Sequence, residues 1–321
     1  MPKEPRINIE NLKSEAQRLG FSACGVSEAQ AVDVQHSEAF AKWLETGKNG
    51  SMDYMARNSD KRLDPSLLLP GAKSVITVAL NYYPSVKIAP NHPQFAYYAY
   101  GKDYHEVMRT RLNRLAHALG IYDVRDKKAE AEVEEGRWRG LVCCDTVPTL
   151  DRYWAWRGGI GWIGRNTSLI IPRVGSFCFL GEIITEVQFD RYDKPMDERC
   201  GKCRRCIEAC PCCALEPFSL DARRCLSYLT IENREEIPAE AAVKMDGYVY
   251  GCDRCQLACP HNYMASPTDV DEFSPSKELL SMTSSDWLTL SKQHYDQLFK
   301  GSAVKRAKYD GLMRNIKASI V

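Results

Sequence analysis

Two runs of cysteine in the second half of the chain have spacings that suit iron–sulfur chemistry. The first, CGKCRRCIEACP at residues 200–211, has the spacing of bacterial two-cluster ferredoxins, in which the fourth cysteine serves the other cluster. The second, CDRCQLACP at residues 252–260, lacks its leading cysteine because Val249 stands there, and Cys225 can fill that gap. The predicted ligands are Cys200, Cys203, Cys206 and Cys259 for one 4Fe–4S cluster, and Cys210, Cys225, Cys252 and Cys255 for the other.

Zinc binding and disulfide bonds are the alternative uses of these cysteines. Structural zinc usually takes two Cys-x2-Cys pairs separated by about a dozen residues or more, whereas three cysteines fall within residues 200–206. Disulfides belong to oxidising compartments, and the N-terminal sequence MPKEPRINIE has no apolar stretch that could act as a signal peptide. No run approaches the ~18 apolar residues of a membrane span. We therefore expect a cytoplasmic protein without membrane contact, in which cysteines ligate metal.

Asp145 is a candidate catalytic carboxylate. It ends a strand-like segment, GLVCCDT at residues 140–146, just before Pro148. A carboxylate at the carboxyl end of a strand faces the crevice where α/β folds place ligands. Alternatively, Asp145 or Thr146 caps the following helix, with Pro148 in its first turn. The spacing alone leaves both alternatives open.

Two weaker motifs lie in the same half of the chain. Residues 103–108, DYHEVM, resemble the D-x-H-x-x-G signature with which some cobalamin enzymes supply a histidine to cobalt, but the glycine is missing. Asp103 could equally be the cap of a solvated helix. Residues 159–164, GIGWIG, match G-x-G-x-x-G, yet a helix is predicted before them and a strand after them, which is the wrong context for a dinucleotide site. These glycines either permit tight turns or let the backbone approach a large flat ligand.

The predicted elements indicate an α/β (α+β) domain followed by two smaller parts. Helical periodicity covers 9–20 and 104–120, a β-branched run at 73–83 predicts a buried strand, and a helix is expected over 148–157. The predicted domains are residues 1–190, 191–265 and 266–321. A cluster module needs only about sixty residues of this chain, so the large first domain favours an enzyme over an electron carrier. The cysteines outside the two runs and their flanks are expected in the core, namely Cys24, Cys143, Cys144 and Cys178.

Several blocks in this order resemble the epoxyqueuosine reductases. They are YYAYGKDYH, DTVPTLDRYWAWRGGIGWIGRNTSLI, the two cysteine runs, and GSAVKRAKYDGLMRN near the end. The resemblance runs from about residue 9 to residue 317 and covers nearly the whole chain. It departs from the family at Cys212 and Cys213, where Thr-Gly is usual, and at Arg165, where Lys is common.

The resemblance implies a fold, a reaction and a set of site residues. The expected fold is a cobalamin-binding domain similar to that of reductive dehalogenases, then a ferredoxin-like domain with two 4Fe–4S clusters, then a short helical tail. The expected reaction is the reduction of epoxyqueuosine to queuosine at the wobble position of tRNA, with Asp145 as the catalytic acid and the eight cysteines above as cluster ligands. The residues expected to bind cobalamin are Arg57, Asp103, His105, Arg165, Asn166 and Ser168.

The expected partners follow from the same resemblance and from charge. They are tRNA carrying epoxyqueuosine and a low-potential electron donor of the flavodoxin or ferredoxin type, with the enzyme itself a monomer. Net charge is only +1, so any RNA contact must come from a local patch. The densest basic stretch is residues 300–317, in which Lys305, Arg306, Lys308 and Arg314 are predicted to contact tRNA. An ordinary solvated terminal helix is the alternative for this stretch.

Two other functions fit the same motifs. One is a cobalamin and iron–sulfur reductase of a small molecule such as an organohalide, which would need no basic RNA surface. The other is an electron-carrier protein whose upstream domain only docks a partner. Cobalt content separates the carrier from both enzymes, and nucleoside analysis of treated tRNA separates the two enzymes.

Overall fold

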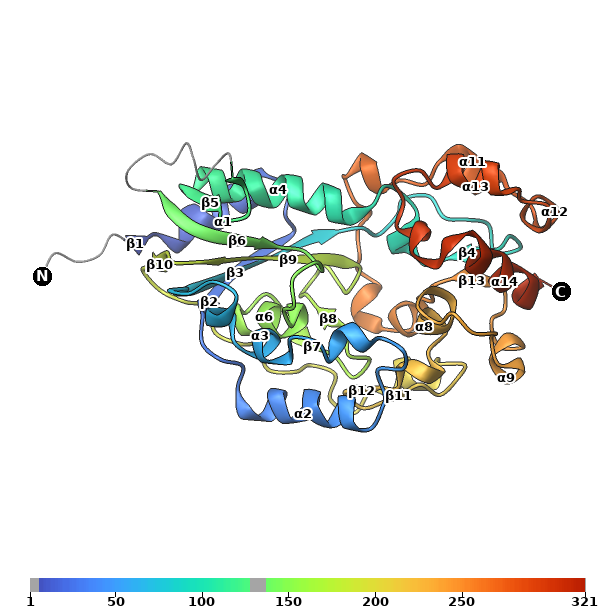
Figure 1. The fold of residues 1–321 in the computed structure, drawn as a ribbon, viewed down its shortest axis with the longest axis horizontal. Coiled ribbons are helices and arrows are strands. Elements are labelled where there is room, and N and C mark those ends of the chain that lie inside the picture. Colours follow the sequence, from blue (N-terminus) through green and yellow to red (C-terminus); the bar gives the residue numbers. More distant parts are fainter. Residues whose placement is uncertain (1–5, 128–136, 321) are drawn as a thin grey trace, which may run out of the picture.

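A five-stranded sheet organises the first half of the computed structural model, which describes residues 6–127 and 137–320 (Figure 1). All strand pairs in the sheet are antiparallel except the edge pair β5–β6. The expected strand at 73–83 is confirmed as β3, which is buried along almost its whole length and therefore rich in β-branched residues. In spatial order, the strands are β2 (Ala23–Glu28), β3 (Ser74–Asn81), β9 (Cys178–Thr185), β6 (Trp138–Cys143) and β5 (Ile121–Asp123).

Helices cover both faces of this sheet. On one face lie α1 (Ile9–Arg18), which packs on β2, and α4 (Tyr104–Ala118), which packs on β5, β6 and β9. The Asn8 side chain caps α1 by accepting from the backbone of Glu10, which fixes where that helix begins. On the other face lies α6 (Asp151–Arg157), which packs on β2, β3 and β9. Figure 1 shows α4 and α1 above the sheet and α6 below it.

The connection between β6 and α6 is longer than the sequence predicted. β6 ends at Cys143 and α6 begins only at Asp151, so 144–150 form a loop at the edge of the sheet. The expected burial of Cys143 and Cys144 is confirmed, whereas Cys24 and Cys178 are only partly buried. The loop leaves Asp145 outside regular structure, on the side of the sheet that faces the cysteine-rich part.

The cysteine-rich part consists of short elements with little regular structure of their own. A strand of this part, β13 (Tyr248–Tyr250), pairs in parallel with β4 (Gln94–Phe95) from the first half of the chain. The other elements are α7 (Arg205–Glu208), β11 (Leu215–Glu216), β12 (Ser219–Leu220), the 3-10 turn η4 (Ala222–Arg224), α8 (Leu226–Ile231), α9 (Ala239–Ala242) and α10 (Arg254–Leu257).

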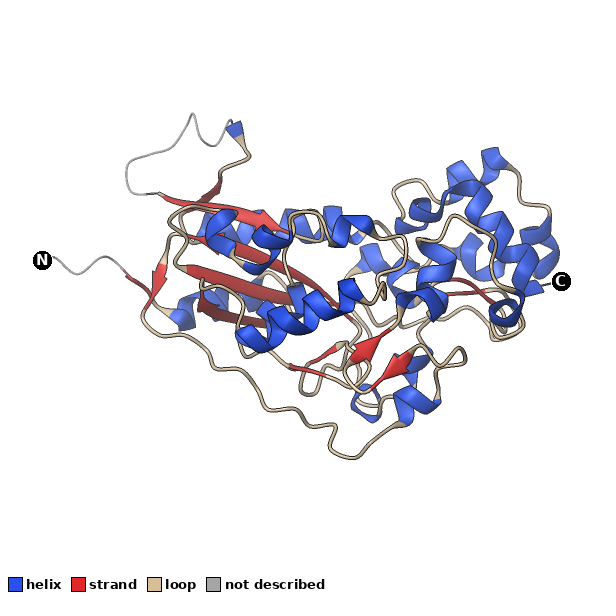
Figure 2. Ribbon diagram, turned by 60° about the horizontal axis from the view of Figure 1, so that its bottom comes forward, coloured by secondary structure: helices blue, strands red, loops and turns tan. Residues whose placement is uncertain are grey.

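The C-terminal helices form a second core at the far end of the molecule (Figure 2). This core includes Phe95 and Tyr100 from the first half as well as Trp287 and Leu312, so the segment around β4 packs with the C-terminal part and not with the large sheet. Among the described residues, every helix is too short or too polar to cross a lipid bilayer. The C-terminal helices are α11 (Lys277–Ser281), α12 (Ser284–Leu288), α13 (Lys292–Leu298) and α14 (Lys308–Ile320), with the 3-10 turn η7 (Ala303–Ala307) before α14.

Candidate functional site

The four cysteines predicted for the first cluster line one small cavity. Cys206 lies in α7 and Cys259 lies just beyond α10, and these two short helices pack on each other. The structure therefore brings together residues that spacing alone had grouped across some fifty positions. The cavity is also lined by Arg165, Asn166, Ile170, Pro260 and His261.

Buried N–H groups beside this cavity lack acceptors. Trp162 Nε1, Arg165 Nε and Asn166 Nδ2 have no hydrogen-bond partner among the described residues. The Trp162 ring packs against Cys200 and Cys259, and the other two residues line the cavity. Hydrogen bonds to the sulfurs of a cluster are one of the features that set its reduction potential. This set of donors therefore fits an iron–sulfur cluster in the cavity.

The four cysteines predicted for the second cluster are also neighbours. Burial raises the pKa of Cys255 well above its usual value, and the thiols of Cys225, Cys252 and Cys210 raise it further. Burial likewise raises the pKa of Cys252 to about 12. Metal binding overcomes such shifts because the thiolate is the ligand. Cys212, which the spacing left without a role, is buried beside Cys210 and Cys225.

A line of tyrosines connects the second cysteine set with Asp145. Asp253, which lies between Cys252 and Cys255 in the sequence, accepts a hydrogen bond from the Tyr97 backbone N–H at 2.7 Å. The next residue, Tyr98, has its ring 6.3 Å from that of Tyr104. The Tyr104 hydroxyl donates to Asp145 Oδ2. The second set is thus joined to the candidate acid through packed aromatic side chains.

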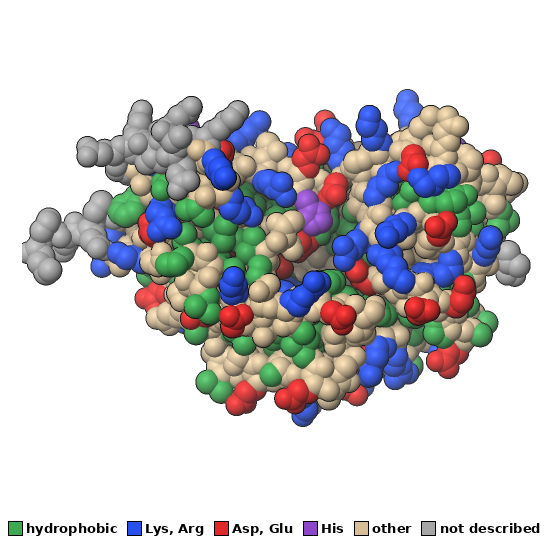
Figure 3. Space-filling view, in the orientation of Figure 1, with side chains coloured by type: hydrophobic (Ala, Val, Ile, Leu, Met, Phe, Trp, Pro, Cys, Tyr) green, Lys and Arg blue, Asp and Glu red, His purple; other side chains and the backbone are tan. Residues whose placement is uncertain are grey.

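Asp145 has a left-handed backbone, with φ at +52°, which is uncommon for a residue other than glycine. The capping alternative is wrong, because the N-cap of α6 is Leu150 and no side chain caps that helix. The Asp145 side chain is 44% exposed. Figure 3 shows a hollow in the middle of the face seen in Figure 1, with a histidine and acidic side chains at its rim. A strained backbone of this kind is typical of functional sites.

The motif at 103–108 supports Asp145 from α4. Asp103 caps α4 by accepting from the His105 N–H, and its Oδ1 lies 2.6 Å from His105 Nδ1. His105 Nε2 lies 3.7 Å from Asp145 Oδ2. The hydrogen bond with Asp103 raises the pKa of His105 above its ordinary value and lowers that of Asp103. Burial and the neighbouring Asp145 carboxylate raise the pKa of Tyr104 well above its usual range.

Two further carboxyls lie next to each other near this group, one fully buried and one partly buried. Glu182, in the middle of β9, is fully buried. No donor other than the neighbouring Asp151 carboxyl is within hydrogen-bond reach of it among the described residues. Asp151 Oδ1 accepts from Thr149 Oγ1 at 2.7 Å. Burial raises the pKa of both acids, to about 6 for Asp151 and well above its usual range for Glu182, and Asp145 adds to both shifts.

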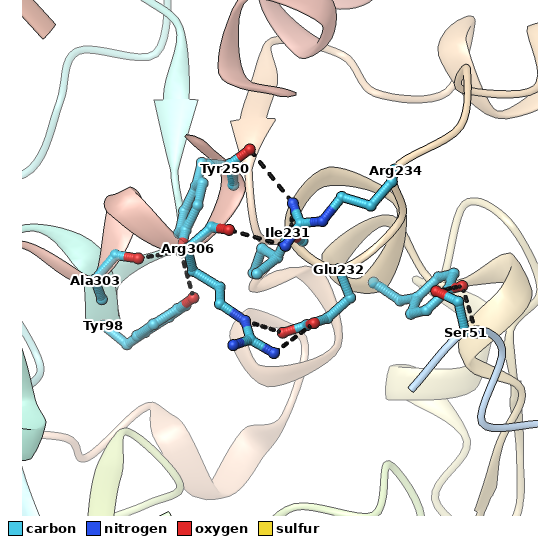
Figure 4. Close-up of polar contacts among 10 residues, drawn as sticks. Ser51, Tyr98, Ile231, Glu232, Arg234, Tyr250, Ala303 and Arg306 are labelled. Carbon is cyan, nitrogen blue, oxygen red and sulfur yellow. Dashed lines mark hydrogen bonds and ion pairs between the residues drawn. The ribbon is translucent and has the colours of Figure 1, made fainter. Parts of the chain in front are cut away.

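A second group of side chains near Asp145 contains Arg306, predicted above as a tRNA contact, together with Glu232 and Tyr54, which sequence reasoning did not single out. Arg306 donates to both oxygens of Glu232 at 2.8 Å, and Figure 4 shows the two side chains directed toward each other from different segments. The Arg306 guanidinium lies 5.7 Å from the centre of the Tyr54 ring. Burial raises the pKa of Tyr54, and both Glu232 and Asp145 add to that shift. Tyr54 therefore lies between the ion pair and the candidate acid.

The four residues predicted to contact tRNA differ in whether their side chains already form hydrogen bonds or ion pairs within the protein. Lys305 is 2.5 Å from Asp296, and Arg306 is paired with Glu232. Arg314 donates to backbone carbonyls near the end of α8, which ties α14 to that helix. Within the described part of the chain, Lys308 has no hydrogen-bond or ion-pair partner. Lys308 is thus the member of the set most available to a ligand.

The residues expected to bind cobalamin fall into three places. Asp103 and His105 lie beside Asp145, as described above. Arg57 is exposed on the loop that also carries Tyr54. The remaining three belong to the segment at the first cysteine cavity, where the Ser168 N–H donates to Asn166 Oδ1. These residues are Arg165, Asn166 and Ser168.

The glycine-rich segment 159–164 serves tight packing. A Cβ at Gly161 would lie 2.4 Å from the Ile170 carbonyl oxygen, and one at Gly159 would lie 2.6 Å from the Lys194 carbonyl oxygen. As expected, α6 precedes the segment, and the short hairpin β7 (Trp162–Ile163) with β8 (Leu169–Ile170) includes and follows it. The turn alternative is therefore favoured over a cradle for a flat ligand.

Comparison with known proteins identifies the family. A family model described as epoxyqueuosine reductase QueG, DUF1730, matches residues 62–146, and one described as a 4Fe-4S double cluster binding domain matches residues 199–262. The epoxyqueuosine reductase of Cellulophaga algicola is 41% identical over 306 residues, which cover 95% of each chain. That of Pseudomonas aeruginosa is 35% identical, over 99% of this chain and 86% of its own.

Solved structures agree with these relatives. A crystal structure of an epoxyqueuosine reductase with an epoxyqueuosine-modified tRNA-Tyr stem loop has a TM-score of 0.84 at 28% identity, covering 97% of this chain and 80% of its own. A Bacillus subtilis epoxyqueuosine reductase, with its catalytic aspartate loop swung out of the active site, has a TM-score of 0.82 at 28% identity over the same shares. On the strength of its relatives, this chain belongs to the epoxyqueuosine reductase family.

Proposed function

We propose that this protein reduces epoxyqueuosine to queuosine in the anticodon loop of tRNA, with cobalamin and two 4Fe–4S clusters as cofactors. The observation that carries the proposal is Asp145, which has a left-handed backbone and a partly exposed carboxylate held beside Tyr104 and His105. Of the two cysteine sets, the first lines a cavity of its own, and the second is connected to Asp145 through tyrosines. A proton source and an electron source at one cavity are what the removal of an epoxide oxygen requires.

The residues around the hollow fit a polar cofactor such as cobalamin. Asp103, His105 and Asp145 are close to one another, with side chains 36%, 32% and 44% exposed, so they can meet polar groups of such a cofactor. Asp103 and His105 would lie on the α4 side of the cofactor, and Arg57, Arg165, Asn166 and Ser168 on the loops around it. When bound, cobalamin supplies a strongly reducing cobalt centre, and iron–sulfur clusters reach the low potentials needed to feed it.

Asp145 would act as the acid of the reaction. Opening an epoxide and expelling its oxygen consumes two electrons, and the oxygen must be protonated as it leaves. Tyr104 holds one oxygen of Asp145 by a hydrogen bond, and His105 lies next to the same oxygen. This arrangement fixes the direction of the carboxyl and leaves its exposed side toward the hollow. A positioned acid is typically worth ~10²–10⁴ in rate.

The tRNA would approach across the basic C-terminal stretch. The target base belongs to a single-stranded loop, so it can be splayed into a pocket at little cost. Lys308 offers a free ammonium group, and Arg306 stands at the hollow with one terminal nitrogen not engaged by Glu232. We further infer a cytoplasmic monomer that receives electrons from a flavodoxin or ferredoxin.

The test is incubation of reconstituted protein with epoxyqueuosine-containing tRNA, cobalamin and a strong reductant, followed by nucleoside analysis. Queuosine should replace epoxyqueuosine in the digest, and omission of cobalamin should abolish the conversion. Unchanged epoxyqueuosine in the presence of full iron, sulfide and cobalt contents would contradict the proposed function.

A further inference from the structure

The surface around the first cysteine cavity is strongly basic. Residues 199–205, RCGKCRR, contain four cationic side chains and no acid, although the chain as a whole carries a net charge of only +1. All four cationic residues are exposed. Of the flanking acids, Glu198 is engaged with the Cys200 backbone N–H at 2.8 Å. We call Arg199, Lys202, Arg204 and Arg205 the α7 collar.

Exposed apolar side chains lie next to the α7 collar. Arg205 donates to the Tyr263 hydroxyl at 3.1 Å, which places the segment after Cys259 beside α7. Tyr263 is 68% exposed and Met264 is 71% exposed, and Leu257 on the neighbouring α10 is 37% exposed. A small apolar area with basic residues around it is suited to brief, electrostatically guided contact with an acidic protein.

We propose that the α7 collar is the docking surface for a small, acidic, low-potential electron-transfer protein. This inference rests on the proposed function, because it assumes a cluster in the first cysteine cavity. At each encounter the partner loses one electron and the first cluster gains it. The cavity is enclosed by the same segments that carry the collar, namely α7, its preceding loop and the end of α10. A partner on the collar is therefore as close to that cluster as the surface allows.

The two cysteine sets differ in their relation to Asp145. The second set is connected to Asp145 through tyrosines, so it would pass electrons to the active site, whereas the first set would receive them. The first set faces the collar, and the second faces the candidate active site through Asp253 and Tyr98. A substrate tRNA must reach Asp145. Reduction of the first cluster, by contrast, does not require RNA at the α7 collar. The position of the collar therefore favours an acidic protein over RNA as its partner.

The test measures electron uptake by the holoenzyme directly. A bacterial flavodoxin reduced to the hydroquinone is mixed with oxidised holoenzyme, and bleaching of the cluster absorbance is followed by stopped flow. Steering by charge raises association rates by ~10–10³-fold, so the Lys202→Glu/Arg204→Glu variant should react at least about ten-fold more slowly at low ionic strength. The difference should vanish at high salt. Binding of oxidised flavodoxin should weaken in parallel.

The matched control is Arg114→Glu/Lys277→Glu, which changes net charge equally. Both residues are exposed on α4 and α11, at the top of Figure 1, whereas α7 packs beside β11 at the bottom. This control and the reduction of either variant by dithionite should match the parent. If the Lys202→Glu/Arg204→Glu variant contains less cluster than the parent, Lys202→Gln/Arg204→Gln is used in its place. A smaller decrease in the rate of reduction by flavodoxin is then expected.

Two outcomes would overturn the inference. One is a flavodoxin rate for the collar variant equal to that of the control, and the other is a loss of tRNA affinity without a loss of flavodoxin rate, which would make the collar an RNA surface. Failure of the proposed function has a different signature. In that case no queuosine forms even with dithionite, while electron uptake from flavodoxin still depends on the collar.

Discussion

At the scale of single residues, Asp145 is held in a conformation that its own sequence does not favour. The hydrogen bond from Tyr104 and the nearby His105 ring compensate part of the strain of a positive φ. His105 is in turn fixed by Asp103, so three residues of one helix start determine where the carboxyl points. Asparagine tolerates the same backbone and keeps most of the hydrogen bonding.

Asp145→Asn should therefore leave the fold and the cofactors in place but lose turnover. An amide cannot deliver a proton, so the conversion of epoxyqueuosine should fall by ~10²–10⁴-fold. Single-turnover rates with quantified queuosine measure the loss, and iron, cobalt and tRNA affinity serve as controls. Activity within a few-fold of the parent would remove Asp145 from the role of acid.

Glu182 and Asp151 predict a pH dependence of stability. Burial raises the pKa of Asp151 to about 6 and that of Glu182 well above its usual value. The folded chain thus holds protons that the unfolded chain releases above about pH 4, so the free energy of unfolding falls as pH rises from about 4 to 6 and beyond. Each such proton contributes a slope of up to ~1.4 kcal/mol per pH unit.

Glu182→Gln removes one of these ionisations while it keeps the side-chain shape. The variant should lose less stability than the parent between pH 5 and pH 8, and melting temperatures at the two pH values measure this. Glu240→Gln, on the exposed face of α9, is the control and should leave the parent's dependence unchanged. Parallel curves for parent and Glu182→Gln would show that Glu182 is ionised in the folded protein.

At the scale of elements, close backbone contact positions α6 against the sheet. A Cβ at Gly25 of β2 would lie 1.9 Å from the Gly158 carbonyl oxygen at the end of α6. The helix cannot move away without shifting the loop that carries Asp145, because the loop leads directly into α6. Two small residues therefore set the distance between a helix and a strand, and through it the position of the active-site loop.

Gly25→Ala should destabilise the protein by at least about 1–3 kcal/mol, the usual cost of overpacking. The matched control is Gly311→Ala in α14, where the new Cβ would meet only the Ala307 side chain at an ordinary 3.7 Å. That change should stabilise by roughly 0.5–1 kcal/mol, since alanine replaces glycine inside a helix. Chemical unfolding of the two variants beside the parent distinguishes them, and equal stabilities would contradict the packing argument.

The sequence predicted local features well and partners across the chain poorly. The two cysteine sets could be grouped because cluster geometry is encoded in short spacings and in one gap that only Cys225 could fill. Arg306 and Arg314 could be recognised as basic residues. Their hydrogen-bond partners Glu232 and Asn233 lie 74 and more residues away in the sequence, so the sequence could not show that these side chains are already hydrogen-bonded within the protein. Glu182 did leave a signal, a charge within an otherwise apolar strand, which could have been read as a buried functional acid.

At the scale of the whole molecule, the three expected regions share elements and cores. β4 pairs with β13, and β1 (Arg6–Ile7) pairs with β10 (Gln188–Phe189), so strands join segments that are far apart in the sequence. The boundaries after residues 190 and 265 remain predictions. The basic C-terminal stretch is anchored to the cysteine-rich part through Arg314 and Arg306, which leaves Lys308 to meet a ligand.

Lys308→Ala should weaken tRNA binding through the loss of one phosphate contact. The log–log slope of affinity against salt should flatten by ~0.7–0.9, with cofactor content unchanged. Lys305→Ala, which removes a lysine already paired with Asp296, should change the slope less. Fluorescence anisotropy with a labelled anticodon stem loop at several salt concentrations measures both, and an unaltered slope for Lys308→Ala would move the RNA surface elsewhere.

The pairing of β4 with β13 also determines when, during translation, this part of the fold can form. The partner strand leaves the ribosome some 150 residues after β4, which takes about 8–30 s at ordinary translation rates. During that interval Phe95 and Tyr100 have no C-terminal core to enter, and the cysteines that complete both clusters have not been made. Cluster assembly is therefore a late event in synthesis, and until it can occur the growing chain carries an open strand edge and exposed aromatic residues.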